Sequence, residues 1–317
     1  MSRQVDVPDL VRQTAVSYGA IGRRWLEGLG ALVSELEHDW DIAVGATLSG
    51  GTASYVARAT TADGESVVIK LAMPAELEGL GDLSSEIRTL KIAGGHGCAR
   101  LYRHDEDRRA LLIEQLGRKL DDLDHPVQSQ LEIICATLPQ LWNASIGDVE
   151  LWSGAEKGRW LADDIARKWE ELDRPCSARV IDRALSFAAN RIARFDPERA
   201  VLVHGDAHGW NTLEEHEGSS RFKFVDPDGL IAEREYDLAI PMREFNDELL
   251  AGDALAIGQE RARFLSRLTG TDAAAIWEWG FIERVSSGLL CLQEGHDFAQ
   301  PFLDIAELWA TSPTWGG

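Results

Sequence analysis

The spacing of hydrophobic residues changes along the chain, and each change predicts a different kind of element. Between residues 9 and 39 hydrophobic residues recur every three or four positions, which predicts a helical lead-in. From 42 to 71 the period shortens, and turn residues at 49–52 and 61–65 divide the stretch into three antiparallel strands. The first part of the chain is therefore expected to combine a helical segment with a small antiparallel sheet.

A helix and a hairpin are expected to complete this part, and the pattern then becomes mainly helical. The helix is expected to begin near Asp82, and the hairpin to use residues 101–104 and 110–117. The change after Gly117 predicts an α+β fold with two lobes, and 317 residues are enough to give each lobe a core. The later helices are expected at 127–143, 157–172, 177–195, 254–268 and 272–292. The lobes are expected at 1–115 and 116–317, with a hinge near 114–116.

Two apolar runs interrupt the helical pattern, and each is expected to form a short strand that ends in an acidic loop. Val201-Leu202-Val203 leads into His204-Gly205-Asp206, and Asn211 follows five positions after the aspartate. Phe222-Lys223-Phe224-Val225 leads into Asp226-Pro227-Asp228-Gly229. We therefore predict a catalytic loop at 203–211 and a metal loop at 225–229, both in the second lobe.

These loops carry the residue types that phosphoryl transfer to a small hydroxyl compound needs. Asp206 is expected to orient the acceptor hydroxyl and to accept its proton. Asn211 and Asp226 are expected to bind Mg²⁺, which Asp226 would link to the β- and γ-phosphates of ATP. His204 is interpreted as a residue that braces the loop through a backbone hydrogen bond, and His208 has no assigned role.

The first lobe offers a nucleotide site. Lys70, near the end of the third strand, is expected to anchor the α- and β-phosphates. Glu86 lies at the edge of a helical apolar face and is expected to hold that lysine, because an inward carboxylate needs a cation. Backbone N–H groups of Ser49-Gly50-Gly51-Thr52 can approach phosphates. Adenine is expected against Ile113 and Leu116, bonded to the backbone from Glu114 to Leu116.

The charge balance limits the possible partners. The chain has 32 Lys and Arg against 53 Asp and Glu, a net charge of −21, and no basic cluster. This argues against nucleic acid or an anionic membrane surface as a partner and favours a cationic small-molecule acceptor, although a solvated acidic surface is an equal alternative. Residues that could meet such an acceptor are Trp210, Asp228, Glu233, Glu235, Glu244, Asp247, Glu278 and Glu283.

Other sequence features concern the location and state of the protein. No apolar run approaches the length of a membrane span, and acids stand near the N-terminus where a secretory signal would be apolar. The four cysteines are scattered, which is typical of reduced thiols rather than of disulfides or a zinc site. We therefore expect a cytoplasmic protein, and a monomer because no coiled coil is indicated.

Two other functions use the same residues. His204, Asp206 and His208 alternate in a way that could bind zinc in a metallohydrolase, although no second His/Asp cluster with matching spacing follows. A related protein could also bind nucleotide and transfer nothing, but the full set of acids argues against it. A kinase with a metabolic acceptor, such as an amino sugar or an amino alcohol, is the closest alternative.

The two acidic loops resemble those of the aminoglycoside phosphotransferase family, which has a bilobal protein-kinase-like fold. The start of the chain, Val7-Pro8-Asp9-Leu10 and Gly22-Arg23-Arg24-Trp25-Leu26-Glu27-Gly28-Leu29, resembles streptomycin 6-kinases and aminoglycoside/hydroxyurea antibiotic resistance kinases. The stretch from Asp226 to Leu238, with Tyr236-Asp237-Leu238 at its end, carries the same resemblance.

The resemblance implies ATP- and Mg²⁺-dependent O-phosphorylation of a small molecule. It implies Asp206 as the base, Asn211 and Asp226 as metal ligands, and Lys70 as the nucleotide lysine. It also implies that Asp237 braces the catalytic loop. The turn at 49–52 departs from the GxGxxG pattern of protein kinases, so the phosphate contacts there are loosely assigned.

Overall fold

The structure is a computed structural model that describes residues 5–49, 51, 53–74 and 83–312. Their contacts divide the chain into two compact units. The first contains Met1–Arg118 and Leu213–Asp228, and the second contains Lys119–Thr212 and Gly229–Gly317. The sequence analysis placed 213–228 in the second lobe, whereas the contacts group this segment with the first part of the chain.

Unit 1 is built on a five-stranded antiparallel sheet with the strand order β1-β2-β3-β5-β4. Because each strand pairs with a neighbour close in sequence, hairpin turns are sufficient to connect β1 to β2, β2 to β3 and β4 to β5. The three strands and the hairpin predicted from the sequence are present. Their bounds are β1 Ile42–Thr47, β2 Ser54–Thr61, β3 Ser66–Ala72, β4 Leu101–Asp105 and β5 Ala110–Glu114.

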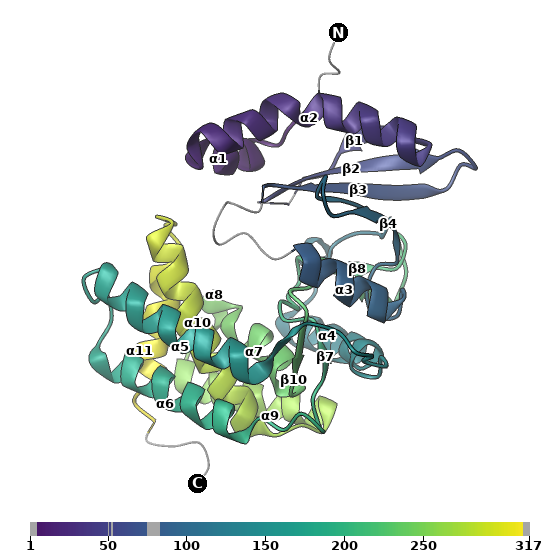
Figure 1. Ribbon diagram of the computed structural model, residues 1–317. Helices are drawn as coiled ribbons and strands as arrows, with labels where there is room; N and C mark the ends of the chain where they lie inside the picture. The colour runs from purple at the N-terminus through teal and green to yellow at the C-terminus, as the bar shows by residue number, and fades with distance from the viewer. Residues whose placement is uncertain (1–4, 50, 52, 75–82, 313–317) are drawn as a thin grey trace. The chain divides into compact units, whose positions relative to one another are not determined.

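One face of this sheet is covered by the N-terminal helices (Figure 1). The predicted lead-in is two helices, α1 (Asp9–Ser17) and α2 (Gly19–Trp40), because Gly19 adopts a left-handed φ of 68°. The α2 side chains at the three- and four-residue spacing enter the core with alternate residues of β3. Because strand side chains alternate, the β3 residue between Ile69 and Leu71 faces away from this core. That residue is Lys70.

The segment 213–228 belongs to unit 1 because of its own pairing. It contains most of a two-stranded sheet, β8 (Thr212–Glu214) with β9 (Phe222–Phe224). The N–H of Phe224 donates to the carbonyl of Gly97 at 2.8 Å, and the N–H of Ala99 donates to the carbonyl of Phe224 at 2.8 Å. These bonds hold the start of the loop that contains Asp226 against the chain that follows α3 (Leu83–Ala93).

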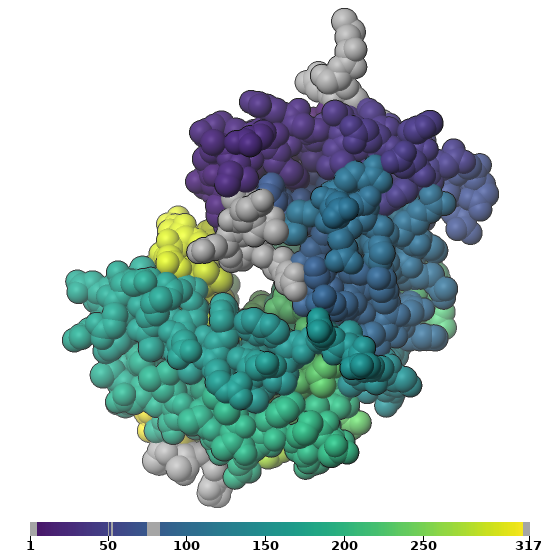
Figure 2. Space-filling model, viewed as in Figure 1, coloured from purple at the N-terminus to yellow at the C-terminus, as the bar shows by residue number. Residues whose placement is uncertain are grey.

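Unit 2 is mainly helical and is organised around α10 (Ala273–Gln293). Most of α10 is buried on all sides, and it packs against α5, α6, α7, α9 and α11. The amphipathic α5 and α6 lie at the surface of this unit, where they appear in teal in Figure 2. The other helices are α4 Val127–Trp142, α5 Gly154–Glu171, α6 Ala178–Arg194, α7 Glu235–Arg243, α8 Asn246–Leu250, α9 Ala254–Thr269 and α11 Gln300–Trp309.

Several short elements of unit 2 were not predicted. A small sheet with the order β6-β10-β7 joins Trp152–Ser153, Leu230–Ala232 and Val201–Val203. The sequence analysis predicted β7, the strand before the first acidic loop, but not β6 or β10, whose two and three residues leave too little alternation to detect. It also missed α8, α11 and the 3₁₀ turn Leu120–Leu123. Among the helices of the described residues, none has the length and apolar character that crossing a bilayer requires.

The contact between α7 and α10 requires a glycine, and this gives a first prediction. A Cβ built on Gly280 would lie 2.6 Å from Cβ of Met242 in α7. We expect Gly280→Ala to lower the free energy of unfolding by about 1–3 kcal/mol, because the helices cannot separate without losing packing. Urea unfolding followed by tryptophan fluorescence measures this change.

The matched control is Gly28→Ala in α2, where a Cβ would meet nothing within 4 Å. This change should leave stability the same or raise it by about 0.5–1 kcal/mol, because alanine favours the helix. Equal effects of the two substitutions would contradict the packing argument.

Candidate active site

Three predicted site residues of unit 1 form one group, which we call the lysine group: Lys70, Glu86 and Asp226. Nζ of Lys70 donates to both carboxylate oxygens of Glu86, at 2.9 and 2.7 Å, and to Oδ1 of Asp226. Lys70 comes from β3 and Glu86 from the first turn of α3. The structure thus pairs the strand lysine with the helix glutamate that the sequence analysis selected.

The lysine group is charged and largely buried. Lys70 is 8% exposed and Glu86 is 6% exposed. Burial alone would lower the pKa of Lys70, but the carboxylates of Asp226 and Glu86 raise it above its ordinary value. Lys70 is therefore a permanent cation at neutral pH, with its charge already compensated by two carboxylates.

Asp226 differs from its two partners in exposure and in backbone conformation. Its side chain is 45% exposed. Its φ is 56°, in a left-handed region that few residues other than glycine occupy and that aspartate tolerates better than most. This turn directs the carboxylate to Lys70 immediately after β9 ends.

Of the turn at 49–52, which was predicted to contact phosphates, the structure describes only Ser49 and Gly51. Gly50 and Thr52 lie outside the described residues, while Ser49 is exposed. A Cβ on Gly51 would lie 3.0 Å from the carbonyl oxygen of Ser54, so the backbone there is close-packed.

The end of β5, where adenine binding was predicted, has its own contacts. The Glu114 N–H donates to the carbonyl of Arg100 at 2.8 Å, and the Glu114 carboxylate accepts from Lys223 at 2.7 and 2.9 Å. The Leu116 side chain is half-buried. A base at 114–116 would therefore depend on backbone groups other than the Glu114 N–H.

In unit 2 the predicted catalytic loop is held by Asp237, in the first turn of α7. Its carboxylate accepts from the backbone N–H groups of His204 at 3.1 Å and Gly205 at 2.8 Å. It also accepts from Nε1 of Trp142 at 2.8 Å. Gly205 adopts a φ of 86°, which turns the chain sharply after β7. These bonds connect the start of α7 to the backbone at His204 and Gly205.

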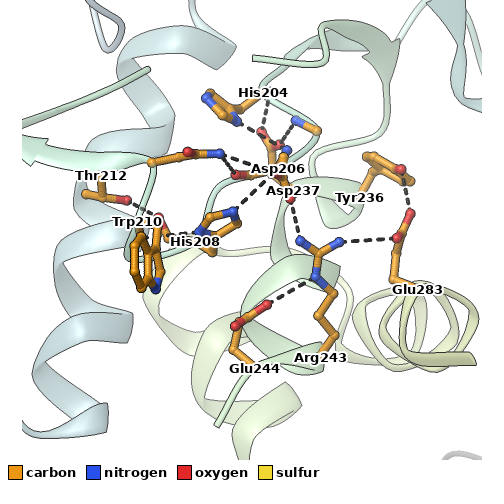
Figure 3. A network of polar contacts seen from close by, with 12 residues as sticks. His204, Asp206, His208, Trp210, Thr212, Tyr236, Asp237, Arg243, Glu244 and Glu283 are labelled. Atoms are coloured by element: carbon orange, nitrogen blue, oxygen red, sulfur yellow. Dashed lines mark hydrogen bonds and ion pairs between the residues drawn. The ribbon is translucent and has the colours of Figure 1, made fainter. Parts of the chain in front are cut away.

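Asp206 follows this turn, and its side chain is engaged by three donors (Figure 3). Nε2 of His208 lies 3.1 Å from Oδ2, and Nδ2 of Asn211 donates to the same oxygen at 3.1 Å. Nη2 of Arg243, at the end of α7, donates to Oδ1. Because the Trp210 N–H donates to Nδ1 of His208, the His208 ring carries its proton at Nε2 and donates it to Asp206.

These donors keep Asp206 ionised. Burial acts to raise the pKa of the Asp206 carboxyl, but His208 and Arg243 hold it well below its ordinary range. An anion of this kind is well suited to accept a hydrogen bond from a hydroxyl and to orient it. It is a weak proton acceptor until the hydroxyl becomes acidic during the reaction.

Two members of this arrangement were not identified from the sequence. Arg243 was not selected, because nothing near it in the chain distinguishes it from other helix arginines. His208 was noted, but its role was left open, and the structure gives it a direct contact with Asp206. Its spacing two residues after the aspartate was the only available signal.

His204, part of the histidine–aspartate alternation that suggested a zinc site, makes a hydrogen bond to the backbone. Nδ1 of His204 accepts the backbone N–H of Asp206 at 3.1 Å, and the His204 side chain is fully buried. This bond lies within the turn that leads into Asp206. Across the ranges that the structure describes, no three His, Cys, Asp or Glu side chains form a group that could hold a metal ion.

The predicted acceptor residues separate into different environments. Trp210 is 50% exposed, and Nζ of Lys119 lies 4.5 Å from the centre of its ring. Asp228 is exposed. Glu278 instead accepts from Asn190 at 2.6 Å and pairs with Arg191 at 2.6 Å, and Glu233 pairs with Arg191 at 3.3 Å. The contacts of Glu233 and Glu278 thus connect α6 and α10 with the start of α7 and do not support acceptor binding.

The environment of Asp237 predicts a pH dependence of stability. Burial raises the pKa of Asp237 to about 6, although the bonds from Gly205, Trp142 and His204 limit the rise. The unfolded chain releases this proton near pH ~3.9, so between about pH 4 and 6 the folded state binds more protons. The contribution of this carboxyl to the free energy of unfolding should therefore fall, by at most ~3 kcal/mol, as pH rises through that window.

Urea unfolding of the wild-type protein and of Asp237→Asn at several pH values measures this contribution. The difference in unfolding free energy, wild type minus variant, should decrease from pH 4 to about 6.5 and then stay level. A difference that is constant or rises with pH would show that Asp237 does not titrate in this way.

Comparison with known proteins gives relatives of one functional kind. The chain is 24% identical to streptomycin 6-kinase of Streptomyces griseus over 298 residues, which cover 93% of each chain. It is 26% identical to hydroxyurea phosphotransferase of Kitasatospora aureofaciens over 224 residues, 66% of this chain and 63% of that one.

Solved structures confirm the predicted fold. A choline kinase from Streptococcus pneumoniae matches with a TM-score of 0.63 and 16% identity, over 90% of this chain and 100% of that chain. An aminoglycoside phosphotransferase from Streptomyces rimosus, in complex with ADP and streptomycin, matches with a TM-score of 0.55 and 16% identity. That match covers 82% of this chain and 98% of the other. The protein-kinase-like fold is therefore shared.

The sequence profile of one family matches residues 39–295, most of the chain, and these residues include Lys70, both acidic loops and Arg243. The resemblance inferred from the two loops is confirmed. The chain belongs to the aminoglycoside/hydroxyurea antibiotic resistance kinase family.

Proposed function

We propose that this kinase transfers the γ-phosphate of magnesium-bound ATP to a hydroxyl group of a cationic small molecule of the aminoglycoside or aminocyclitol type. Family membership establishes a small-molecule phosphotransferase. The observation that carries the finer proposal is the environment of Asp206, an ionised carboxylate fixed by three donors. Such a carboxylate can bind the acceptor hydroxyl and orient its oxygen for attack.

The roles follow from the chemistry of phosphoryl transfer. Its transition state is loose in most analyses, so positioning and charge stabilisation contribute more than early proton removal. A carboxylate with a depressed pKa suits this requirement, because it orients the hydroxyl first and accepts the proton late. Lys70, held by Glu86, is assigned to the α- and β-phosphates. The turn at 49–52 is assigned to the phosphates and residues 114–116 to adenine.

Asn211 and Asp226 have the chemistry required for the metal ligands. The Asn211 amide nitrogen donates to Asp206, which directs the amide oxygen elsewhere, and Asp226 exposes nearly half of its side chain. Amide and carboxylate oxygens are the donors that Mg²⁺ prefers. Mg²⁺, when bound, would neutralise charge on the β- and γ-phosphates.

A cationic acceptor is supported by the acids near Asp206. Glu244, with 34% of its side chain exposed, contacts Arg243 at 3.1 Å. Glu283 lies 3.6 Å from the same guanidinium. Two carboxylates in addition to Asp206 thus lie around one cation, Glu283 buried and Glu244 partly exposed, and this excess of negative charge favours amine-bearing ligands. The net charge of −21 acts in the same direction. The streptomycin 6-kinase relative bears the name of an acceptor of this chemical class.

Turnover by Asp206→Asn tests the proposal directly. Acceptors are screened by mass spectrometry with ATP and Mg²⁺: aminoglycosides, aminocyclitols, hydroxyurea, amino sugars and choline-like alcohols. We expect a phosphorylated amine-bearing product, and we expect Asp206→Asn to lower kcat about 10²- to 10⁴-fold with nucleotide binding retained.

The control is Asp182→Asn on the exposed side of α6, which should turn over normally. Normal turnover by Asp206→Asn would show that Asp206 is not the base. Stabilisation by ATP without a product from any acceptor would instead indicate a nucleotide-binding protein that transfers nothing.

The lysine group makes a separate prediction about ATP. Lys70→Met should weaken ATP binding about 10- to 100-fold, because a charge-assisted bond to phosphate is lost. Isothermal titration with ATP and Mg²⁺ measures the dissociation constant, and circular dichroism verifies that the variant is folded. Lys91→Met, in the last turn of α3, is the matched control and should bind ATP normally. An unchanged dissociation constant for folded Lys70→Met would exclude the nucleotide role.

A further inference from the structure

Arg243 is the one partner of the Asp206 side chain that lies outside the catalytic loop, among the contacts of the described residues. Its guanidinium lies between three carboxylates (Figure 3). Nη2 donates to Asp206, Nε donates to Glu244 at 3.1 Å, and Nη1 lies 3.6 Å from Oε2 of Glu283. Glu283 also accepts from the Tyr236 hydroxyl at 2.6 Å. The arginine is thus held by two further carboxylates while it binds the base.

The backbone on both sides of Arg243 accepts hydrogen bonds from two buried arginines of other helices. Nη1 of Arg261 donates to the carbonyl of Glu244 at 2.9 Å. Nη2 of Arg284 donates to the carbonyl of Met242 at 2.8 Å, on the other side of Arg243. Both arginines are 5% exposed or less. The backbone on each side of Arg243 is therefore held by the helices α9 and α10.

The same turn contains a strained residue. Phe245 has a φ of 60°, which is rare for a bulky side chain and is tolerated only where the surroundings enforce it. The Arg261 guanidinium lies 5.3 Å from the centre of the Phe245 ring. Residues in such conformations gather at functional sites. Here the strain follows directly after the pair Arg243 and Glu244 beside Asp206.

The three donors leave part of the Asp206 carboxylate free to accept another hydrogen bond. An ionised carboxylate offers about four lone-pair positions, two on each oxygen. His208 and Asn211 both occupy Oδ2, and Arg243 occupies one position on Oδ1. One position therefore remains, on the oxygen that Arg243 binds.

We infer that Arg243 is a positioning residue that orients the Asp206 carboxylate so that the acceptor hydroxyl binds the remaining position on Oδ1. The inference rests on the proposed function, in which Asp206 orients that hydroxyl. Without Arg243, Oδ1 has two open positions and the carboxylate is held only at Oδ2, by His208 and Asn211. The hydroxyl then loses its single defined direction, although the loop and the lysine group remain in place.

The test compares Arg243→Met with wild type, alone and in the Asp206→Asn background. We expect Arg243→Met to lower kcat about 10²-fold with KM for ATP changed less than about 2-fold, because orientation is lost and nucleotide binding is not. Arg243→Lys, which retains one charged donor, should lose about tenfold. In Asp206→Asn the added Arg243→Met should change the residual kcat less than about 3-fold, because Arg243 acts through that carboxylate.

An arginine with a merely structural role would give another pattern. Arg243→Met would then lower kcat by the same factor in both backgrounds, or raise KM for ATP together with the loss of kcat, and either result overturns the inference. If circular dichroism shows that Arg243→Met does not fold, Arg243→Lys decides, and wild-type kcat in that variant overturns the inference. Arg267→Met, on the exposed side of α9, is the control and should retain wild-type kcat.

The outcomes separate this inference from the proposed function. Wild-type turnover by Asp206→Asn would show that the base is wrongly assigned, and the positioning role would fail with it. Loss of turnover in Asp206→Asn together with normal turnover in Arg243→Met would leave the proposed function standing and remove only the role of Arg243.

Discussion

The loop that contains Asp206 depends on a buried carboxylate that accepts hydrogen bonds from N–H donors. The Asp237 carboxylate accepts hydrogen bonds from the backbone N–H groups of His204 and Gly205. It lies in the first turn of α7, where the helix dipole favours a negative charge. Arg243 lies six residues further along the same helix, a rise of about 9 Å, and it binds the Asp206 side chain. One helix therefore fixes both the backbone of the loop and the direction of the Asp206 side chain.

The position of α7 is in turn set by the core of unit 2. Met242 fits against Gly280 of α10, and its carbonyl accepts from the buried Arg284 of the same helix. A larger side chain at 280 would move α7, and with it both contacts to the loop. The packing of α7 against α10 thus helps to set the direction of the Arg243 side chain, and α10 also supplies Glu283, which lies 3.6 Å from its guanidinium.

The sequence was sufficient to identify residues whose role follows from local pattern. Lys70 faces away from the apolar core because β3 alternates, and Glu86 follows from the spacing of a short helix. The acidic loops follow from apolar runs that end in His-Gly-Asp and Asp-Pro-Asp-Gly. Arg243 could not be predicted in this way, because its contact with Asp206 depends on where α7 lies in unit 2. The grouping of 213–228 with unit 1 could not be predicted for the same reason, since the bonds of Phe224 join this segment to Gly97 and Ala99, more than a hundred residues earlier.

In unit 1 the predicted site residues are also held by contacts between segments that are distant in sequence. Lys223 binds Glu114 at the end of β5, and Asp226, three residues after Lys223, binds Lys70 in β3. Because β3 and β5 are neighbours in one sheet, these two contacts fix the start of the Asp226 loop at two points of that sheet. The proposed adenine residues and the proposed phosphate residues are thus held by one set of hydrogen bonds. A segment that is distant in sequence thus completes the group through these two ion pairs, and Asp226 does so with a left-handed φ.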